Sequence, residues 1–240
     1  MKKLNPTIVL VRPQLSENIG MTARAMDNFG LSKLYIVNPR DDWSSLKAEK
    51  SAKHAKNIIK KVKIFSSLED AISKFNHVIA TTNRNRFLTK KTYNNFIDFK
   101  KKINDFNNTA ILFGPENSGL SNQDLRLANY IFTIKTNNLN KSLNLSHAVL
   151  IISYELFCSN FIPKKINNNS KKNSELASKL ELSNFINFLI NDLDSRNFFK
   201  PLEKKDSMID NIYSIYNKID LTKKELRMLW GMHKKLKNLP

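Results

Sequence analysis

Residues 109–121 read TAILFGPENSGLS, a run of strand-forming residues that leads directly into a turn containing Gly114 and Gly119. A short apolar run bounded by a turn is typical of a buried strand. Ser121 and Asp124 have the spacing of a capping box, which predicts a helix directly after the turn. A strand, a polar turn and a helix in this order predict one unit of an α/β sheet, with the turn at the carboxyl end of its strand.

The same pattern extends in both directions along the chain. Further strands are predicted at residues 7–11, 33–37, 77–81 and 130–134, and helices at residues 16–29, 45–63 and 145–160, with a brief helix capped by Ser66 and Glu69. Gly30 follows the first helix at the position where a glycine ends many helices. Strands that alternate with helices predict a parallel α/β sheet up to about residue 160.

The composition changes after residue 160. Residues 161–174 are polar and charged, without an apolar period, which predicts a linker between a first domain, residues 1–160, and a second, residues 175–240. Three helices are predicted in the second domain, at residues 176–193, 204–216 and 222–236. About sixty residues make a small core, so we expect this all-helical extension to pack on the first domain or on a second subunit.

The composition indicates a folded protein of a reducing compartment. The 240 residues are 41% hydrophobic, enough for a core, and the one cysteine, Cys158, cannot form an internal disulfide. No apolar run approaches the ~18 residues that a membrane helix needs, and the first residues, MKKLNP, lack the apolar segment of a signal peptide. We therefore expect a cytoplasmic protein without a membrane partner.

The charge of the chain is compatible with a nucleic-acid partner. The net charge of +19 favours a polyanion as the binding partner. An alternative stays open here, because 32 lysines and 32 asparagines against eight arginines are also typical of a codon bias toward A and T. Such a bias raises the charge without any bound nucleic acid.

The five glycines are more informative than the charge. Four of them, Gly20, Gly30, Gly114 and Gly119, fall in two short segments, and the fifth is Gly231. Where a sequence avoids glycine, we expect each one that remains to lie where the backbone requires it.

Four polar loops follow the predicted strands. They are residues 12–24, 81–86, 114–121 and 135–146, each rich in asparagine, serine or arginine. Because the carboxyl ends of parallel strands meet at one edge of a sheet, we expect these loops to converge on a ligand site. For single residues a purely structural role stays open: Glu116 as a helix cap, Arg24 in a surface ion pair, and residues 142–146 as a helix start.

Several kinds of site are excluded by missing motifs. The two glycines of residues 109–121 have P-loop spacing, but Leu120 stands where the obligatory lysine would be. No GxGxxG follows a strand, which argues against a dinucleotide site, and no GxSxG indicates a hydrolase. The four histidines have no partner at metal-binding spacing, so we expect no metal site. Cys158 lies on an apolar helix face, which favours a core position over a nucleophile.

Three segments together carry a specific resemblance. The first is Asn18-Ile-Gly20-x-x-Ala-Arg24-Ala-Met26, with Phe29-Gly30-Leu31 and Val37-Asn38-Pro39 after it; the second is Phe113-Gly-Pro-Glu116-Asn-Ser-Gly-Leu120-Ser121; the third is Ser142-Leu-Asn144-Leu-Ser146-x-Ala148-Val149. Their order and spacing over residues 7–157 resemble the three motifs of the SPOUT-class, TrmH-like RNA 2′-O-ribose methyltransferases. The helical extension resembles the TrmJ branch, which methylates the ribose of nucleotide 32 in tRNA anticodon loops.

The resemblance implies a fold and partners that periodicity does not indicate. The fold would be a SPOUT-type parallel sheet with a C-terminal trefoil knot, working as a homodimer on tRNA, with S-adenosylmethionine in the knot loops and no metal. The implied cofactor-binding residues are Thr81, Thr82, Asn83, Gly114, Ile134, Ser142, Leu143 and Asn144. The implied catalytic residues are Arg24, Asn18, Glu116, Ser142 and Asn144, and we expect Arg84, Arg86 and Lys141 to contact RNA.

The implied reaction is 2′-O-methylation of a cytidine or uridine in tRNA. The protein must align the ribose hydroxyl with the methyl carbon and assist the loss of one proton. Arg24 holds the family's catalytic position, but arginine is a very poor base, so we expect a forked grip on a phosphate and the developing alkoxide. Asn18 would position Arg24 or the RNA, Glu116 would hold the loop or orient Arg24, and Ser142 and Asn144 would fix the cofactor and the acceptor ribose.

Two other functions stay open from the sequence. An enzyme of the same class could act on rRNA or on another tRNA nucleotide, because substrate choice resides in the helical extension and the basic surface. A non-catalytic RNA-binding protein of this fold would not need the catalytic positions, and all five are present. The sequence therefore favours an enzyme.

Overall fold

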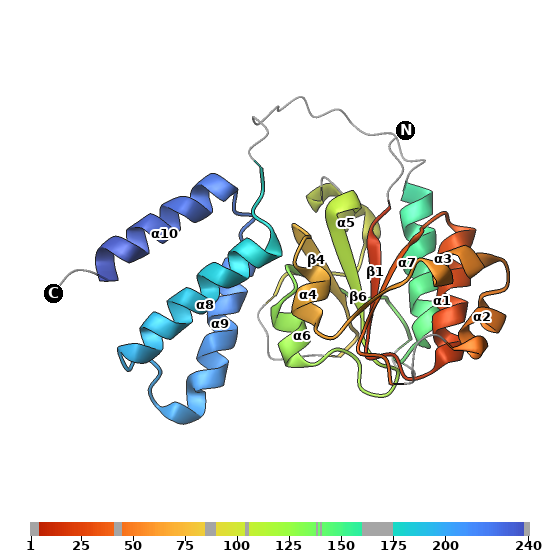
Figure 1. The fold of residues 1–240 in the computed structure, drawn as a ribbon, viewed down its shortest axis with the longest axis horizontal. Coiled ribbons are helices and arrows are strands. Elements are labelled where there is room, and N and C mark those ends of the chain that lie inside the picture. The colour runs from red at the N-terminus through yellow and green to blue at the C-terminus, as the bar shows by residue number, and fades with distance from the viewer. Residues whose placement is uncertain are drawn as a thin grey trace.

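The computed structural model describes residues 5–40, 45–84, 90–103, 106–137, 139, 141–159 and 175–237. Within these residues one seven-stranded sheet has the order β3-β2-β1-β6-β4-β7-β5, and every neighbouring pair is parallel (Figure 1). The strands are β1 (Thr7–Val11), β2 (Lys33–Val37), β3 (Lys63–Phe65), β4 (His77–Thr81), β5 (Thr92–Tyr93), β6 (Thr109–Phe113) and β7 (Tyr130–Phe132). The parallel α/β sheet predicted from the sequence is confirmed.

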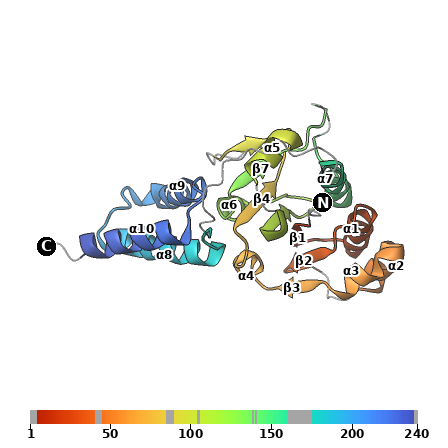
Figure 2. The same ribbon diagram turned by 90° about the horizontal axis from the view of Figure 1, so that it is seen from above.

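Helices cover both faces of the sheet (Figure 2). One face is covered by α1 (Ser16–Asn28), α2 (Leu46–Ala52), α3 (Lys56–Lys60), α5 (Phe96–Lys102) and α7 (Leu145–Ser159), and the other by α4 (Leu68–Ile72) and α6 (Asn122–Arg126). Helix α8 (Lys179–Ser195) packs against α4 and shares the core of this second layer. In the central strand β1, Ile8 and Leu10 belong to the first core, and Val9 and Val11 to the second. A strand that is apolar on both faces is what a sheet covered on both sides requires.

The C-terminal helices form an arm on one side of the sheet, which we call the helical arm (residues 175–237). It consists of α8, α9 (Lys205–Asn217) and α10 (Lys223–Lys237), with a 3-10 turn at Leu202–Lys204; two further 3-10 turns lie in the sheet domain, at Lys53–Ala55 and Phe106–Asn108. Phe185 joins the three helices, since its ring lies 5.2 Å from the Tyr216 ring and 5.6 Å from the Trp230 ring. Figures 1 and 2 both show the arm projecting away from the sheet.

Hydrogen bonds fix the arm to the sheet domain. The Lys179 backbone N–H donates to the Phe75 carbonyl at 2.9 Å, and Asn217 Nδ2 donates to the Arg126 carbonyl at 3.0 Å. The arm therefore packs on the sheet domain, one of the two positions expected. The predicted linker, residues 161–174, lies outside the described residues. Every helix in the described ranges is too short or too polar to cross a bilayer.

Two predicted helix details are wrong. The helix predicted at residues 45–63 breaks at Lys53, whose φ is 54°, so that α2 ends and a 3-10 turn, α3 and then β3 follow. The next helix is capped one residue later than predicted, by Ser67 in place of Ser66. The Ser67 hydroxyl oxygen accepts from the Asp70 N–H at 3.1 Å, which satisfies one of the free N–H groups at the helix start.

Strand β5 and helix α5 were not predicted from the sequence, and the predicted β7 is too long. Helix α5 begins after Asn95, whose side-chain oxygen accepts from the N–H groups of Ile97 at 2.9 Å and Asp98 at 3.3 Å. This cap is the signal that was overlooked. Strand β7 ends at Phe132, so Ile134 lies in the loop that follows it.

Gly30 ends α1 as predicted. Its φ is 69°, its N–H donates to the Asp27 carbonyl at 3.0 Å, and the Leu31 N–H donates to the Met26 carbonyl at 2.9 Å. These two bonds satisfy the last carbonyls of the helix in a Schellman motif, which needs the left-handed backbone that glycine adopts without strain.

Candidate functional site

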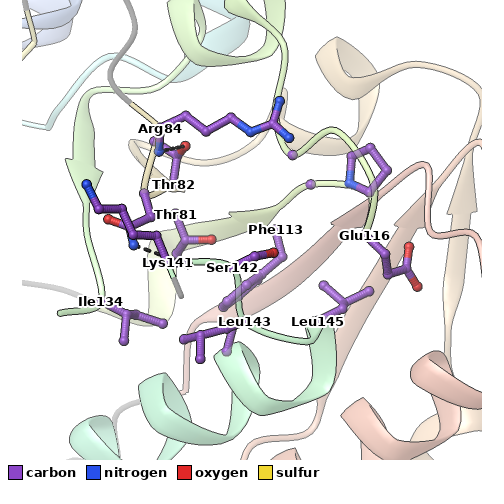
Figure 3. Close-up of a pocket in the computed structure, with 15 residues that line it drawn as sticks. Thr81, Thr82, Arg84, Phe113, Glu116, Ile134, Lys141, Ser142, Leu143 and Leu145 are labelled. Carbon is purple, nitrogen blue, oxygen red and sulfur yellow. Dashed lines mark hydrogen bonds between the residues drawn. The ribbon is translucent and has the colours of Figure 1, made fainter. Parts of the chain in front are cut away.

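A cavity of about 690 Å³ lies at the carboxyl ends of β4, β6 and β7 (Figure 3). Three of the four predicted polar loops form its wall. The lining residues are Thr81, Thr82, Asn83, Arg84, Phe113, Gly114, Pro115, Glu116, Gly119, Ile134, Lys141, Ser142, Leu143, Leu145 and Ala148. The predicted convergence of these loops is therefore observed, and the cavity has the size of a small-molecule site.

The loop after β6 is shaped by its two glycines. A Cβ on Gly114 would lie 2.3 Å from the Leu120 backbone nitrogen, closer than real Cβ contacts come. The Gly119 N–H donates to the Pro115 carbonyl at 2.8 Å, and the φ of Gly119 is 65°. The loop thus folds back onto its own backbone and presents main-chain groups to the cavity. Ser121 and Asp124 form the predicted capping box of α6.

The loop after β4 holds the loop after β7. The Thr133 hydroxyl donates to the Thr82 carbonyl at 2.9 Å. Asn83 Nδ2 donates to the Thr136 hydroxyl at 3.0 Å and to the Lys141 carbonyl at 2.9 Å. Asn83 therefore fixes two points of the segment that precedes Ser142.

A chain of hydrogen bonds joins the three sequence motifs beside the cavity. Asn18 Nδ2 donates to Glu116 Oε1 at 2.7 Å, and Asn144 Nδ2 donates to Asn18 Oδ1 at 3.1 Å. Asn144 Oδ1 accepts from the Ser146 N–H at 2.9 Å and from the Ser146 hydroxyl at 2.7 Å. At the other end, Glu116 Oε2 accepts from the Gln14 N–H at 2.9 Å.

Backbone N–H groups, which only donate, set the donor–acceptor direction at both ends of this series of hydrogen bonds. The Ser146 N–H requires the Asn144 amide oxygen, so the Asn144 amide nitrogen must face Asn18, and the Asn18 amide nitrogen must face Glu116. Amides at these positions pass no proton onward. Glu116 therefore accepts hydrogen bonds that fix the start of α1, and the network holds its members in one orientation.

Arg24 lies apart from this network. It is exposed on α1, it does not line the cavity, and its guanidinium makes no hydrogen bond or ion pair with the part of the chain that the structure describes. The contacts expected from Asn18 and Glu116 to Arg24 do not occur, because these two side chains bond each other. Asn18 is 2% exposed, and its amide group is engaged by Glu116 and Asn144.

Two cations line the cavity. Arg84 Nη2 donates to the Asn117 carbonyl at 3.1 Å, and Lys141 stands beside Ser142 (Figure 3). Both are exposed, as a role in RNA binding requires. Arg86, the third cation predicted for RNA binding, lies outside the described residues.

The other predicted residues are distributed as follows. All the predicted cofactor-binding residues except Asn144 line the cavity; Asn144 lies behind it, in the hydrogen-bonded chain. The apolar lining residues Phe113, Leu145 and Ala148 were not predicted as site residues. Their signal was available, because each of the three lies within a quoted motif. Among the described residues no group of three metal-ligating side chains occurs.

One further side chain that the sequence analysis did not single out as a site residue ties two loops together. The Arg12 guanidinium, after β1, forms an ion pair with Asp124 of α6. Asp124 also accepts from the Ser121 N–H at 2.7 Å. Arg12 thus connects the loop before α1 to the helix that follows the Gly114 loop.

Known proteins share this architecture. A model of the SpoU rRNA Methylase family matches residues 5–154. A crystal structure of TrmJ from Z. mobilis ZM4 is 34% identical, with a TM-score of 0.86 over 97% of this chain and 99% of that chain. The tRNA (cytidine/uridine-2′-O-)-methyltransferase TrmJ of Pectobacterium atrosepticum is 29% identical over 95% of each chain. The SpoU methyltransferase AviRb of Streptomyces viridochromogenes, in complex with AdoMet, shares the fold, with a TM-score of 0.54 at 20% identity over 67% of this chain and 62% of that chain.

Proposed function

This chain belongs to the SpoU rRNA Methylase family, and on that premise we propose that it is an S-adenosylmethionine-dependent tRNA 2′-O-ribose methyltransferase of the TrmJ type. The proposed target is the pyrimidine at nucleotide 32 of the anticodon loop. The observation that carries the proposal is the single cavity wall built from all three loops that contain the cofactor-binding positions. The TrmJ relatives support tRNA as the substrate, since the similarity to the Z. mobilis protein extends over the helical arm.

The cavity fits the proposed cofactor. Ile134, Leu143 and Phe113 supply apolar surface for an adenine ring, and the Gly114 loop supplies backbone donors and acceptors (Figure 3). S-adenosylmethionine supplies a methyl carbon that its sulfonium makes electrophilic. The residues proposed to hold it are Thr81, Thr82, Asn83, Gly114, Ile134, Ser142 and Leu143, with Asn144 supporting Ser142 and Leu143 from behind the cavity.

The chain's own residues would position the acceptor and stabilise charge. Ser142 lines the cavity and is proposed to orient the ribose hydroxyl. Asn18, Glu116 and Asn144 would hold the loops around it through their hydrogen-bonded chain. Arg24 would grip a neighbouring phosphate and the developing alkoxide, because its fork of N–H groups matches such oxygens.

This role for Arg24 requires a second copy of the chain. Arg24 does not line the cavity of its own chain, and it shares an exposed face of α1 with Met21, one turn away. Helix α7 packs beside α1 and exposes Leu150, Tyr154 and Phe157 to solvent. An apolar patch of this kind marks an interaction surface. We therefore propose a homodimer that pairs the α1–α7 faces and brings Arg24 to the partner's cavity.

The domain boundaries and the backbone path belong to the same proposal. We propose a SPOUT domain at residues 1–160, a linker at 161–174 and a helical RNA-binding domain at 175–240. The trefoil knot would form where the chain after β7 passes between the loop after β4 and helix α1. The bonds from Asn83 to Lys141 and from Asn144 to Asn18 support this path. Because the substrate is tRNA, we propose the cytoplasm as its location.

The test is methyl transfer from labelled S-adenosylmethionine to unmodified tRNA, with wild type, Arg24→Ala and Arg24→Lys. We expect label in the ribose of an anticodon-loop pyrimidine, lost in Arg24→Ala and only partly kept in Arg24→Lys, which retains the charge without the fork. Cofactor binding without transfer to any tRNA would indicate another RNA, such as rRNA. The absence of cofactor binding would contradict the enzyme and leave an RNA-binding protein.

A further inference from the structure

Neither close packing nor backbone conformation among the described residues requires a glycine at Gly231. Of the other glycines, Gly20 and Gly114 would place a Cβ within 3 Å of backbone atoms, and Gly30 and Gly119 have positive φ. At Gly231, in the middle of α10, a Cβ would meet no heavy atom of the described residues within 4 Å. A glycine inside a helix destabilises it relative to alanine, so we infer a contact with a group outside the described residues as the reason for it.

Gly231 lies on the outer face of α10. The inner face is occupied, since Leu226 is buried and the Trp230 ring lies 4.5 Å from the Phe188 ring. At about 100° per residue, Lys224, Met228, Gly231 and Lys235 lie on the side opposite Leu226. All four are exposed, and we call them the outer face of α10.

The outer face is basic. Lys224 and Lys235 make no hydrogen bond or ion pair with the described residues. Glu225, the one acidic residue of α10, is turned to the helix start, where Thr222 donates to it through its N–H and hydroxyl at 2.8 Å each. The cations of this face are therefore available to an external anion.

The position of the outer face relative to the cavity is fixed. The arm is bonded to the sheet domain through Lys179 and Asn217, and the Tyr130 hydroxyl donates to Asp220 at 3.0 Å. Figures 1 and 2 show α10 extending away from the sheet, remote from the strands that carry the cavity. A ligand that contacts both the cavity and the outer face must therefore be long.

We propose that the outer face of α10 binds the sugar–phosphate backbone of tRNA away from the methylated nucleotide, with Gly231 as the point of closest approach. The proposal rests on the tRNA substrate proposed above and names the residues of a second contact. A missing side chain lets a phosphate reach the helix backbone, while Lys224 and Lys235 flank it on the same face. A second copy of the chain fits this face less well, because Lys224 and Lys235 would then lie opposite cations of the same kind.

The experiment measures the Kd of full-length protein for labelled unmodified tRNA by fluorescence anisotropy at several salt concentrations. The variants are Gly231→Ala and Lys235→Gln, and Lys33→Gln is the matched control. Lys33 is also exposed, but it begins β2 at the edge of the sheet opposite the cavity. Melting temperature, S-adenosylhomocysteine binding and oligomeric state are measured on the same samples.

We expect Gly231→Ala to weaken tRNA binding roughly threefold or more while its melting temperature stays equal or rises, because alanine favours the helix. In Lys235→Gln, the slope of log Kd against log salt should fall by about 1, and in Lys33→Gln it should not change. S-adenosylhomocysteine binding should be unchanged in all three. A loss of affinity joined to a gain in stability excludes misfolding as its cause.

Three results overturn the inference. The first is an unchanged tRNA Kd in Gly231→Ala and Lys235→Gln. The second is an altered oligomeric state of Gly231→Ala with unchanged tRNA affinity, which would make a second copy the occupant of the outer face. The third is a wild-type protein that binds S-adenosylhomocysteine but no tRNA, which would contradict the proposed substrate itself and is recognised without any variant.

Discussion

Asn18 Nδ2 donates to Glu116 Oε1 at 2.7 Å across 98 residues of sequence. The bond fastens the first turn of α1 to the loop after β6, and Asn144 continues it into the loop before α7. Because the carboxylate already accepts from Asn18 and from the N–H of Gln14, its oxygens are engaged in holding backbone. In the proposed enzyme, Glu116 is therefore a positioning residue and not the base.

Replacing Glu116 by glutamine should disturb both the fold and the activity. The amide would direct an N–H₂ group at N–H donors, and one of them would lose its acceptor. We expect the free energy of unfolding to fall by about 1–2 kcal/mol and kcat to fall roughly 10- to 100-fold. Urea unfolding and methyl transfer measure the two effects. Gln14→Ala is the control, because it keeps the backbone N–H that Glu116 binds; equal losses in both variants would contradict this role.

Gly114→Ala and Gly119→Ala should distinguish two reasons for a glycine in the loop after β6, close packing at Gly114 and a positive φ at Gly119. A Cβ at Gly114 would lie 2.3 Å from a backbone nitrogen, so the loop must move and the cavity wall with it. At Gly119 no described atom lies within 4 Å, and the change meets only the positive φ, at about 1–2 kcal/mol. Calorimetry with S-adenosylhomocysteine should show binding weakened about tenfold or more in Gly114→Ala. Binding that is weakened more in Gly119→Ala would contradict this assignment.

The sheet could be predicted from the sequence because its central strands are apolar along their whole length. TAILF at Thr109–Phe113 and TIVLV at Thr7–Val11 are buried on both faces, and burial of this kind leaves an uninterrupted apolar run. The apolar pattern does not predict a helix break that depends on the backbone conformation of a single residue. Lys53 interrupts a helix that has good periodicity on both sides, and no side-chain pattern shows a φ of 54°.

The contacts within the site were predicted less completely, because they join residues that are far apart in the sequence. The motifs bring Asn18, Glu116 and Asn144 together as expected, but which of them bond each other depends on tertiary placement. From the sequence, contacts of Asn18 and Glu116 with Arg24 were expected, because Asn18 and Arg24 belong to the same motif. On α1 the two residues are six apart, so they point to different sides of the helix. Only the folded structure shows which residue of the motif points into the protein and which points to solvent.

Stability should rise with pH above neutrality because of Lys90. Burial of its ammonium group lowers the pKa of Lys90 to about 7, and this group donates to the Arg126 carbonyl at 2.9 Å and the Ala128 carbonyl at 2.5 Å. Between the folded pKa and the ordinary pKa of 10.5, the unfolded chain holds a proton that the folded chain has released. The free energy of unfolding therefore increases with pH in that window and loses this contribution as pH falls to about 7.

Urea unfolding at pH 7 and pH 9 measures this effect. We expect an increase of about 1–2 kcal/mol in wild type from Lys90. The increase should be smaller in Lys90→Met, where the fully buried Lys179, whose pKa burial also lowers, still contributes. Lys91→Met is the control, since Lys91 is exposed and adjacent. An equal increase in Lys90→Met and wild type would show that Lys90 does not titrate in this range.

Mixing two variants should restore activity if Arg24 serves the cavity of a partner chain, when the assay uses an S-adenosylmethionine concentration too low for Gly114→Ala to be active alone. One variant, Arg24→Ala, keeps its cavity, and the other, Gly114→Ala, keeps its arginine but has a disturbed cavity wall. In a mixed dimer, the intact cavity of the first chain meets the intact Arg24 of the second. Random exchange makes half of the dimers mixed, each with one working site, so we expect about a quarter of wild-type methyl transfer.

The variants are mixed under conditions that exchange subunits and are assayed for transfer to tRNA against each variant alone. Arg24→Ala mixed with an Arg24→Ala, Gly114→Ala double variant is the control, because no mixture of these two contains an Arg24. Activity that stays at the level of the separate variants, with exchange demonstrated by differently tagged chains, would place Arg24 at the cavity of its own chain. The exposed α1–α7 face would then need a role other than completing the active site.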